Sequence, residues 1–324
     1  MRSVLSWRVY ACVQGIEQNG MKILVTGSSG FVGSALVPAL IKQGHTVCRL
    51  VRPGTVTKDS ANDGFQVAWN PVTGELGGAA VGADAVVNLA GASIGEGRWS
   101  AERKAVLRAS RIDSTRALVN ALTKMNARPR VLVSASATGF YGNRGDELLT
   151  EESAPGNEFL SDLAKDWETE ALKAEAIGVR VVLARFGIIL AHDGGALPKI
   201  VLPFRFFAGG KIGSGKQWMS WIILEDVIEI LRLAIENGNV RGPINVISPQ
   251  PVQNAEFTKT LASVLHRPAL FPAPAFALRL VLGEMADALL LSSQRVLPKK
   301  LESLGYRFQR PALSDALANL LGSP

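Results

Sequence analysis

Short apolar runs alternate along this chain with longer segments of helical spacing. The first run, Lys22 to Thr26 (KILVT), is rich in aliphatic residues and predicts a strand. Apolar residues then occur at positions 36, 37, 40 and 41, which is the spacing of one helical face, and Gly44 predicts where that helix ends. A second strand is expected over residues 45–51 (HTVCRLV). The order strand, helix, strand predicts a βαβ unit.

The same alternation continues well beyond this unit. Further strands are expected at 65–69, 83–89, 130–134 and 179–185, and helices at 103–125 and 160–177. Strands that alternate with helices are typical of a parallel sheet with helices on both faces, and such sheets bind ligands at the carboxyl ends of their strands. The predicted fold class is therefore α/β, a Rossmann-like doubly wound parallel sheet with a smaller C-terminal substrate lobe.

A glycine-rich turn, GSSGFVG at residues 27–33, joins the first strand to the first helix. The first glycine permits a sharp turn, the second lets the backbone approach a pyrophosphate, and the third lets the helix pack closely on the strand. The N–H groups at the start of the helix can then bind phosphate oxygens. The turn predicts a dinucleotide site, and the alternative is a tight strand-to-helix turn without a ligand. The residues expected to bind are Gly27, Gly30, Phe31, Val32 and Gly33.

The second strand ends in basic residues and carries no acidic one. Proteins that bind NAD place a carboxylate here for the ribose 2′-hydroxyl, whereas an arginine can donate two charge-assisted hydrogen bonds to a 2′-phosphate. Arg52 therefore predicts NADP(H) as the cofactor. The alternative, for Arg52 and still more for Arg49, is a solvated arginine at a strand end.

Composition and charge exclude several classes of protein. The 35 basic residues are interleaved with 28 acidic ones, so the net charge of +7 predicts an anionic cofactor or substrate and no nucleic-acid partner. Two cysteines and three scattered histidines indicate neither a disulfide framework nor a metal site and favour a cytoplasmic location. No apolar stretch is long enough to span a bilayer, so no membrane partner is expected.

These patterns divide the 324 residues into three parts. Residues 1–20 precede the first strand and are expected to be an extension without the pattern of a signal peptide. Residues 21–190 are expected to form the NADP(H)-binding Rossmann domain, completed by a strand near 243–247. Residues 191–324 are expected to form the substrate lobe, with an extended glycine-containing loop and short helices over 191–222 and a helical segment from 272 onward.

Several motifs carry a family resemblance. The runs TGSSGFVG, VVNLAGA, VLVSASATGFYG and WIILEDV resemble the extended short-chain dehydrogenase/reductase superfamily, in its NAD(P)-dependent epimerase/dehydratase branch. More narrowly, WNP at 69–71, SRI at 110–112, DWE at 166–168, residues 202–222 and NAEF at 254–257 are similar to an "epimerase family protein" subgroup with a C-terminal domain of unknown function. The resemblance covers residues 21 to about 320.

The resemblance implies roles for residues near the strand ends. The catalytic serine or threonine of the superfamily follows the fifth strand, where Ser136 stands, with Ser134 as a near alternative. Lys165 would bind the nicotinamide ribose, and its alternative is a solvated helix lysine. Arg111 would bind cofactor phosphates, with a helix-surface ion pair as its alternative, and Asn70 would lie near the adenine. Further cofactor contacts are expected from Leu89, Ala90, Gly91 and Ser134.

The chain lacks the catalytic tyrosine of the superfamily. That tyrosine belongs to a Tyr-x-x-x-Lys pair in which the lysine lowers the pKa of the phenol, and the residue four before Lys165 is Ser161. A serine hydroxyl is a far weaker acid than a phenol. Tyr141, in a Tyr-Gly pair that matches the substrate pocket of the superfamily, is the candidate substitute. The alternative is an aromatic ring that simply packs at the rim of the cleft.

Two functions remain open. The first is an NADP(H)-dependent oxidoreductase or nucleotide-sugar epimerase-like enzyme that acts on a carbonyl or alcohol carbon of a small, anionic substrate. Arg205, Lys211 and Lys216, with Phe204, Trp218 and Trp221, would line its substrate site, or would be a charged surface over an ordinary aromatic core. The second is a catalytically reduced NADP(H)-binding sensor or regulatory protein. The sequence also leaves open whether the protein is a homodimer.

Overall fold

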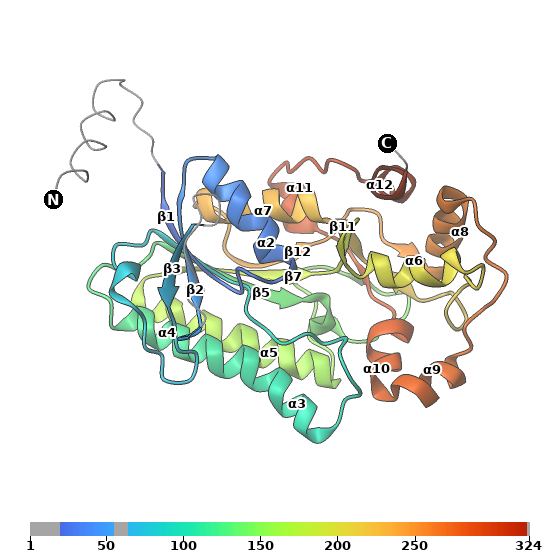
Figure 1. Ribbon diagram of the computed structural model, residues 1–324, viewed down its shortest axis with the longest axis horizontal. Coiled ribbons are helices and arrows are strands. Elements are labelled where there is room, and N and C mark those ends of the chain that lie inside the picture. The colour runs from blue at the N-terminus through green and yellow to red at the C-terminus, as the bar shows by residue number, and fades with distance from the viewer. Residues whose placement is uncertain (1–19, 55–63, 323–324) are drawn as a thin grey trace.

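In the computed structural model, which describes residues 20–54 and 64–322, a parallel sheet flanked by helices is extended at one end by a smaller lobe (Figure 1). The sheet has seven strands in the order β12-β7-β5-β4-β1-β2-β3, and every pair is parallel. This confirms the predicted Rossmann-like α/β fold. The strands are β1 (Lys22–Thr26), β2 (Thr46–Val51), β3 (Phe65–Ala68), β4 (Ala85–Asn88), β5 (Val131–Ala137), β7 (Arg180–Phe186) and β12 (Gly242–Val246).

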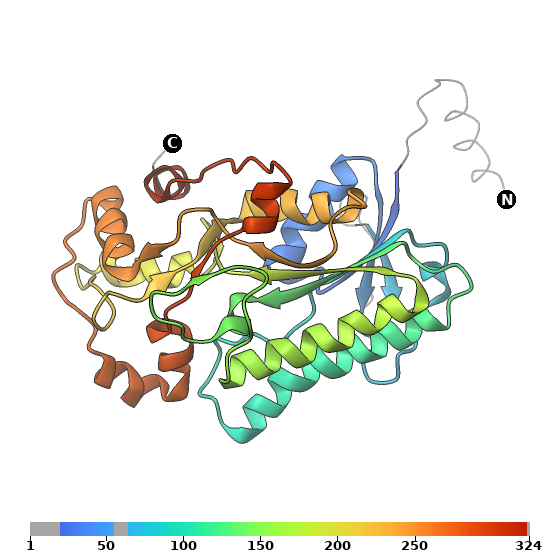
Figure 2. The same ribbon diagram turned by 180° about the vertical axis from the view of Figure 1, so that it is seen from behind.

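Helices cover both faces of the sheet. Helices α2 (Phe31–Lys42) and α7 (Leu224–Glu236) lie on one face, and α4 (Ser114–Thr123) and α5 (Phe159–Leu172) lie on the other, as both views show (Figures 1 and 2). The single long helix expected at 103–125 is interrupted. Helix α3 (Ala101–Arg108) passes through a π-helical turn, η2 (Ala109–Asp113), before α4 begins. Such turns are often found at functional sites.

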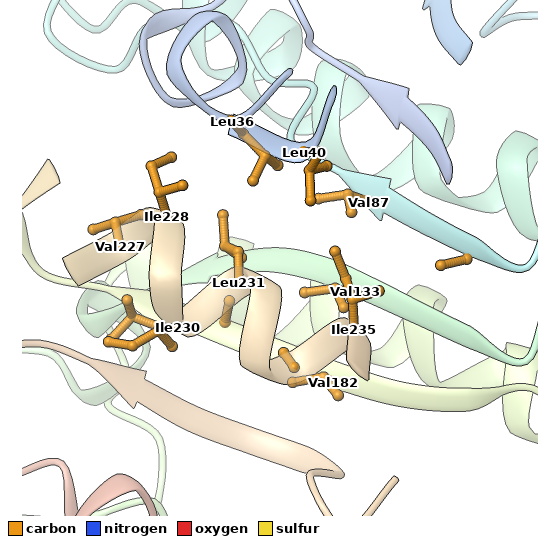
Figure 3. Close-up of a cluster of buried hydrophobic side chains, with 14 of the residues drawn as sticks. Leu36, Leu40, Val87, Val133, Val182, Val227, Ile228, Ile230, Leu231 and Ile235 are labelled. Atoms are coloured by element: carbon orange, nitrogen blue, oxygen red, sulfur yellow. The ribbon is translucent and has the colours of Figure 1, made fainter. Parts of the chain in front are cut away.

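The larger core lies between the sheet and the helices α2 and α7 (Figure 3). Leu40 of α2 and Leu231 of α7 point toward Val87, Val133 and Val182 of the central strands. All five side chains are buried, and burying a side chain of this size contributes about 1.5–3 kcal/mol. Strand β12 lies where a strand near 243–247 was expected to complete the Rossmann domain, whereas helix α7, which also packs on the sheet, comes from the part of the chain that the sequence assigned to the lobe.

The lobe has its own core, centred on Leu190, Trp221, Phe257 and Leu317. Residues 191–222, expected as an extended loop with short helices, contain the helix α6, because Leu197, Val201 and Phe204 form one apolar face. The lobe elements are β8 (Ile188–Ala191), β9 (Gly194–Gly195), α6 (Leu197–Arg205), β10 (Trp218–Met219), β11 (Trp221–Ile223), β13 (Val252–Gln253), α8 (Asn254–Leu265), α9 (Ala275–Leu282), α10 (Glu284–Ala286), η5 (Asp287–Leu291) and α12 (Leu313–Leu321).

Short elements connect the lobe to the sheet. Strand β14 (Arg295–Val296) returns from the lobe to pair with β6 (Leu148–Leu149), which follows β5 in the chain. The remaining short helices are η1 (Gly78–Ala80), η3 (Thr138–Tyr141), η4 (Lys173–Ile177) and α11 (Lys299–Ser303). In the part of the chain that the structure describes, no helix is both long and apolar enough to cross a bilayer.

Candidate active site

The glycine turn brings β1, α2 and the end of β4 into close contact. Gly27 has a φ of 65°, and a Cβ atom there would lie 2.7 Å from the carbonyl carbon of Leu89 and 2.9 Å from the nitrogen of Ala90. At Gly33 a Cβ atom would lie 2.3 Å from the oxygen of Gly27. The turn therefore excludes side chains at both positions, which is the geometry that a dinucleotide-binding turn needs.

The start of α2 is open to an anion. Its N-cap residue, Gly30, makes no side-chain hydrogen bond to the first turn, and that turn contains no acidic residue. Backbone N–H groups at the N-terminus of a 12-residue helix attract phosphate through their unpaired hydrogens and the helix dipole. The residues present therefore fit the pyrophosphate of a dinucleotide.

Phe31 and Val32 of the turn make packing contacts. Val32 packs on the larger core, whereas the ring of Phe31 lies against the β8–β9 hairpin of the lobe. A Cβ atom at Gly194 would lie 2.5 Å from that ring, and one at Gly195 2.8 Å from it. The cofactor turn and the lobe are thus in direct contact.

A buried hydrogen-bond network supports the strand ends beneath the turn. The hydroxyl of Thr26 donates to Asn88 Oδ1 at 2.7 Å and accepts from the backbone nitrogens of Leu89 and Ala90. Asn88 Nδ2 donates to the hydroxyl of Ser134 at 3.3 Å. Because Ser134 is fully buried, its hydroxyl supports the end of β4, whereas the sequence predicted a direct contact with the cofactor or a catalytic role.

Two predicted cofactor residues lie at the β2–β3 edge of the sheet. Arg52 is exposed directly after β2, and Asn70 follows β3, the parallel neighbour of β2. Asn70 Oδ1 accepts hydrogen bonds from the backbone nitrogens of Val72 and Thr73, at 3.0 and 3.3 Å, so it stabilises a local turn. The structure therefore places both residues where the adenosine half of a dinucleotide would lie on this fold.

Arg111 lies within the π-helical turn and against Gly91. A Cβ atom at Gly91 would be 3.0 Å from the guanidinium carbon of Arg111, which also lies 5.3 Å from the ring of Trp167. Its Nη2 donates to the carbonyl of Ala92 at 2.9 Å. No carboxylate among the described residues pairs with this cation, contrary to the helix-surface ion pair considered for it. Burial, with some repulsion from Arg103, lowers the pKa of Arg111 to about 10, so the group remains charged at neutral pH.

Ser136 belongs to a buried network that the sequence did not indicate. Its hydroxyl donates to Glu168 Oε1 at 2.6 Å, and Arg185 binds both oxygens of that carboxylate at 2.7 and 2.8 Å. Arg185 also donates to the hydroxyl of Tyr141 at 2.9 Å and stacks 3.5 Å from the centre of the Phe140 ring. One signal was available, since Glu168 lies on the face of α5 that otherwise carries buried apolar residues.

Tyr141 is enclosed by this network and has no exposed surface. Its hydroxyl donates to Asn245 Oδ1 at 2.6 Å and accepts from Arg185, so both of its hydrogen-bonding directions are used. Burial raises its pKa to about 12, although Arg185 and Asn245 oppose that shift. A weaker acid without access to the cleft is a poor proton donor, so this placement argues against Tyr141 as the substitute for the missing tyrosine.

The protonation of Tyr141 can be tested with a Tyr141→Phe variant. Because the pKa is raised in the folded state, the stabilisation from the neutral phenol is present below pH 10 and is lost as the pH rises toward 12. Folded wild-type protein and the variant should therefore show the same tyrosinate absorbance near pH 10. After denaturation at the same pH, the wild type should show more tyrosinate absorbance than the variant, by the amount that one further tyrosine contributes. A difference already present in the folded proteins would contradict the burial of this phenol.

Backbone atoms occupy the space beside Ser161, the residue at the position of the missing tyrosine. Ser161 is fully buried, and its hydroxyl donates to the carbonyl of Gly139 at 3.0 Å. A Cβ atom at Gly156 would lie 2.7 Å from that hydroxyl oxygen, and one at Gly142 3.1 Å from it. The 139–142 turn and residue 156 thus occupy the space beside residue 161. One helical turn further along α5, Lys165 is exposed and its ammonium group has no partner among the described residues.

The predicted aromatic lining of the substrate site is wrong for two residues. Phe204 and Trp221 are core residues of the lobe, and Trp221 donates to the carbonyl of Gln250. Trp218 is half-buried and donates to Asp146 Oδ1 at 2.7 Å. The three basic residues expected beside them, Arg205, Lys211 and Lys216, are exposed. Among the residues described here, no three His, Cys, Asp or Glu side chains are grouped as a metal site.

Comparisons with known proteins agree with this geometry. Residues 23–246 match the model of the NAD dependent epimerase/dehydratase family, and residues 273–320 match a domain of unknown function, DUF1731. The chain is 42% identical to the epimerase family protein YfhF of Bacillus subtilis over 302 residues, which are 93% of this chain and 98% of YfhF. It is 41% identical to the epimerase family protein ML0860 of Mycobacterium leprae over 297 residues, 91% of this chain and 94% of that protein.

A solved structure is similar over nearly its whole length. The crystal structure of human epimerase family protein SDR39U1 (isoform 2) with NADPH superposes with a TM-score of 0.80 at 32% sequence identity, covering 93% of this chain and 99% of that chain. Both halves of the molecule thus have counterparts in one protein. The chain therefore belongs to the NAD dependent epimerase/dehydratase family, in the epimerase family protein subgroup that carries a C-terminal DUF1731 domain.

Proposed function

We propose that this protein is an NADP(H)-dependent enzyme that acts at a carbonyl or alcohol carbon, as an oxidoreductase or a nucleotide-sugar epimerase. The observation that carries the proposal is the hydrogen bond from Ser136 to Glu168 at the carboxyl end of β5. Because its hydrogen is directed to the carboxylate, the Ser136 oxygen can accept a hydrogen bond from a substrate hydroxyl. This arrangement favours an alcohol as the bound form of the substrate.

Several residues support NADP(H) as the cofactor. The N-terminus of α2 and Arg111 suit its phosphates, Arg52 suits the 2′-phosphate, and Asn70 and the end of β4 lie toward the adenosine half. When bound, NADP(H) supplies the hydride acceptor or donor of the reaction. The NADPH in the structure of the human relative agrees with this choice.

We assign distinct tasks to Ser136, Lys165 and Arg185. Ser136 binds and orients the substrate oxygen, and Lys165, whose ammonium group is exposed, binds the nicotinamide ribose. Arg185 and Glu168 hold the Ser136 hydroxyl in one orientation. Tyr141 stabilises that network and carries no proton in the reaction.

A second function, an NADP(H)-binding sensor or regulatory protein, is favoured by one specific observation. Neither of the two tyrosines within the described residues presents a free phenol, because Tyr141 is enclosed and Tyr306 donates to Asp226 at 2.8 Å. Ser161 is likewise directed to a backbone carbonyl. Proton transfer by a phenol, which is the usual mechanism of the superfamily, is therefore absent from this part of the chain.

Cofactor turnover distinguishes the two functions. Purified protein is titrated with NADPH and NADH by fluorescence and then incubated with carbonyl compounds and nucleotide sugars. Absorbance of the reduced cofactor reports oxidation, and chromatography of the sugars reports epimerisation. Oxidation of the cofactor or epimerisation of any compound supports the enzyme, provided that Ser136→Ala loses this activity and still binds NADPH. Tight NADPH binding without either reaction favours the sensor, and no binding of either nucleotide contradicts both.

Cofactor preference should depend on Arg52. Replacing Arg52 by alanine removes charge-assisted hydrogen bonds worth about 1.5–3 kcal/mol, so NADPH affinity should fall roughly tenfold to hundredfold. NADH affinity should remain unchanged, because NADH has no 2′-phosphate. Lys124→Ala, at an exposed position after α4, is the matched control and should alter neither affinity. An equal loss of NADPH and NADH binding would contradict the role of Arg52.

A further inference from the structure

Exposed apolar side chains lie after α6 and around α9, two elements of the lobe that lie far from β3 (Figures 1 and 2). We define this lobe-end surface by six side chains that are 53–77% exposed: Phe206, Phe207, Leu270, Phe271, Phe276 and Leu280. Four phenylalanines at this exposure present roughly 500 Å² of apolar area. Monomeric proteins rarely leave contiguous patches of more than a few hundred Å² open to water, so this surface indicates a binding partner.

Backbone hydrogen bonds join two of the segments that carry the lobe-end surface. The nitrogen of Phe271 donates to the carbonyl of Gly209 at 3.1 Å, and the nitrogen of Ala273 donates to the carbonyl of Lys211 at 2.9 Å. The segment after α6 is thereby joined to the segment that leads into α9. None of the eight residues of α9 is buried, although its sequence, AFALRLVL, is almost entirely apolar. An apolar helix of this kind is normally buried against other elements, and α9 is not.

The segments that carry this surface are basic. Residues 197–216 and 254–283 contain seven lysines and arginines and one acidic residue, Glu256, a local net charge of 7 − 1 = +6, and the acidic residues Glu284 and Asp287 follow directly. Arg279 is paired with Asp287, whereas Arg205, Lys211, Lys259 and Arg267 are exposed. The guanidinium group of Arg267 lies 4.8 Å from the centre of the Phe207 ring. Basic groups thus border the apolar side chains.

A shallow hollow of about 470 Å³ lies within this basic region. Lys211 and Lys259 contribute its cationic groups, and Ala262, Leu270 and Pro272 contribute apolar wall. Two lysines beside an apolar wall suit a ligand that carries a negative headgroup and a hydrocarbon chain.

We propose that the lobe-end surface docks on a bilayer surface that carries anionic lipids. The phenylalanines and leucines enter the boundary between headgroups and acyl chains, and Lys211 and Lys259 bind a lipid phosphate in the hollow. A second copy of the chain is disfavoured as the partner. A two-fold contact would place the basic segments 197–216 and 254–283 of both copies against each other, and the only acidic residue within them is Glu256. The prediction of no membrane partner rested on the lack of a spanning segment, which peripheral docking does not require.

Vesicle sedimentation with the full-length chain tests the proposal. We expect binding to phosphatidylcholine vesicles that contain phosphatidylglycerol, weak binding to pure phosphatidylcholine, and a decrease with salt. Phe276→Ser combined with Leu280→Ser should lower the partition coefficient at least tenfold. Lys211→Gln combined with Lys259→Gln should lower it roughly tenfold and weaken its salt dependence. NADPH affinity is measured for each variant as a check on folding that is independent of lipid.

The matched control is Phe65→Ser combined with Val72→Ser, which removes apolar side chains that are 60% and 89% exposed on the Rossmann part. This variant should bind vesicles as the wild type does. Three results would overturn the proposal: no binding of the wild type to anionic vesicles, the same loss in the control as in the lobe variants, or binding that neither lobe variant reduces. Dissociation of a dimer by Phe276→Ser and Leu280→Ser, without vesicle binding, would assign the surface to a second copy instead.

Discussion

Replacing Glu168 by alanine should destabilise the protein by about 3–5 kcal/mol, because it leaves the guanidinium group of Arg185 buried without its carboxylate. Both side chains are less than 8% exposed, and the carboxylate accepts three hydrogen bonds, two from Arg185 and one from Ser136. Urea denaturation followed by circular dichroism measures the change. The urea concentration at the midpoint should fall strongly, and the slope of the unfolding free energy against urea should stay unchanged.

Two further variants make this result specific. Combining Glu168→Ala with Arg185→Met removes the unpaired charge as well, so the double variant should recover part of the stability lost by the single one. Glu229→Ala breaks an ion pair with Arg232 whose side chains are both 35% exposed, and it should cost less than about 1 kcal/mol. If Glu168→Ala were as mild as Glu229→Ala, the buried pair would contribute little to the fold.

Replacing Gly33 by alanine should lower the affinity for NADPH roughly tenfold to hundredfold, as expected for an overpacking cost of about 1–3 kcal/mol at the turn. The added Cβ would lie 2.3 Å from the oxygen of Gly27 and 2.7 Å from the Cα of Ser28, so helix α2 must move away from the strand end. Fluorescence titration measures the affinity, and thermal unfolding separates loss of binding from loss of the fold.

Gly238 supplies the control for this substitution. A Cβ atom there meets nothing within 4 Å and the residue has no positive φ, so Gly238→Ala should leave binding unchanged. Unchanged NADPH affinity in Gly33→Ala would contradict the assignment of the turn as the phosphate site. Loss of affinity in both variants would point to an effect of alanine substitution unrelated to the turn.

The parts of the fold that depend on local sequence were predictable. Strand β1 and the glycine turn follow from a short aliphatic run and from glycines at fixed spacing, and both were placed to within a residue. Residues 197–205 were harder to place, because two prolines and nearby glycines predicted only a loop with short helices and did not mark where the helix α6 lies. Pro198 stands at the helix start, where proline is tolerated, whereas Pro203 lies inside α6, where burial of the apolar face outweighs its tendency to break the helix.

The sequence predicted the geometry of the glycine turn but not the network around Ser136. Glycines and strand-end arginines can be recognised from a short stretch of sequence. The network around Ser136 instead joins β5, α5, β7 and β12, which are distant in the chain. The partner of Tyr141, Asn245, lies 104 residues away. A pattern confined to short windows therefore could not show that this phenol is enclosed, and the likeness to a Tyr-Gly motif suggested a role in the cleft.

The segment near residues 296–300 packs back on the sheet, and because it is synthesised late, this packing has a consequence for folding. Asn245 donates to the carbonyl of Leu297, and the backbone nitrogens of Asn245 and Lys300 both donate to Glu151. Until residues near 300 leave the ribosome, Glu151 lacks the donor of Lys300, Asn245 lacks the carbonyl of Leu297, and the apolar cluster around Tyr141 lacks Val296. The Rossmann part thus cannot complete its interior ahead of the lobe, and the two halves of the molecule acquire their final form together.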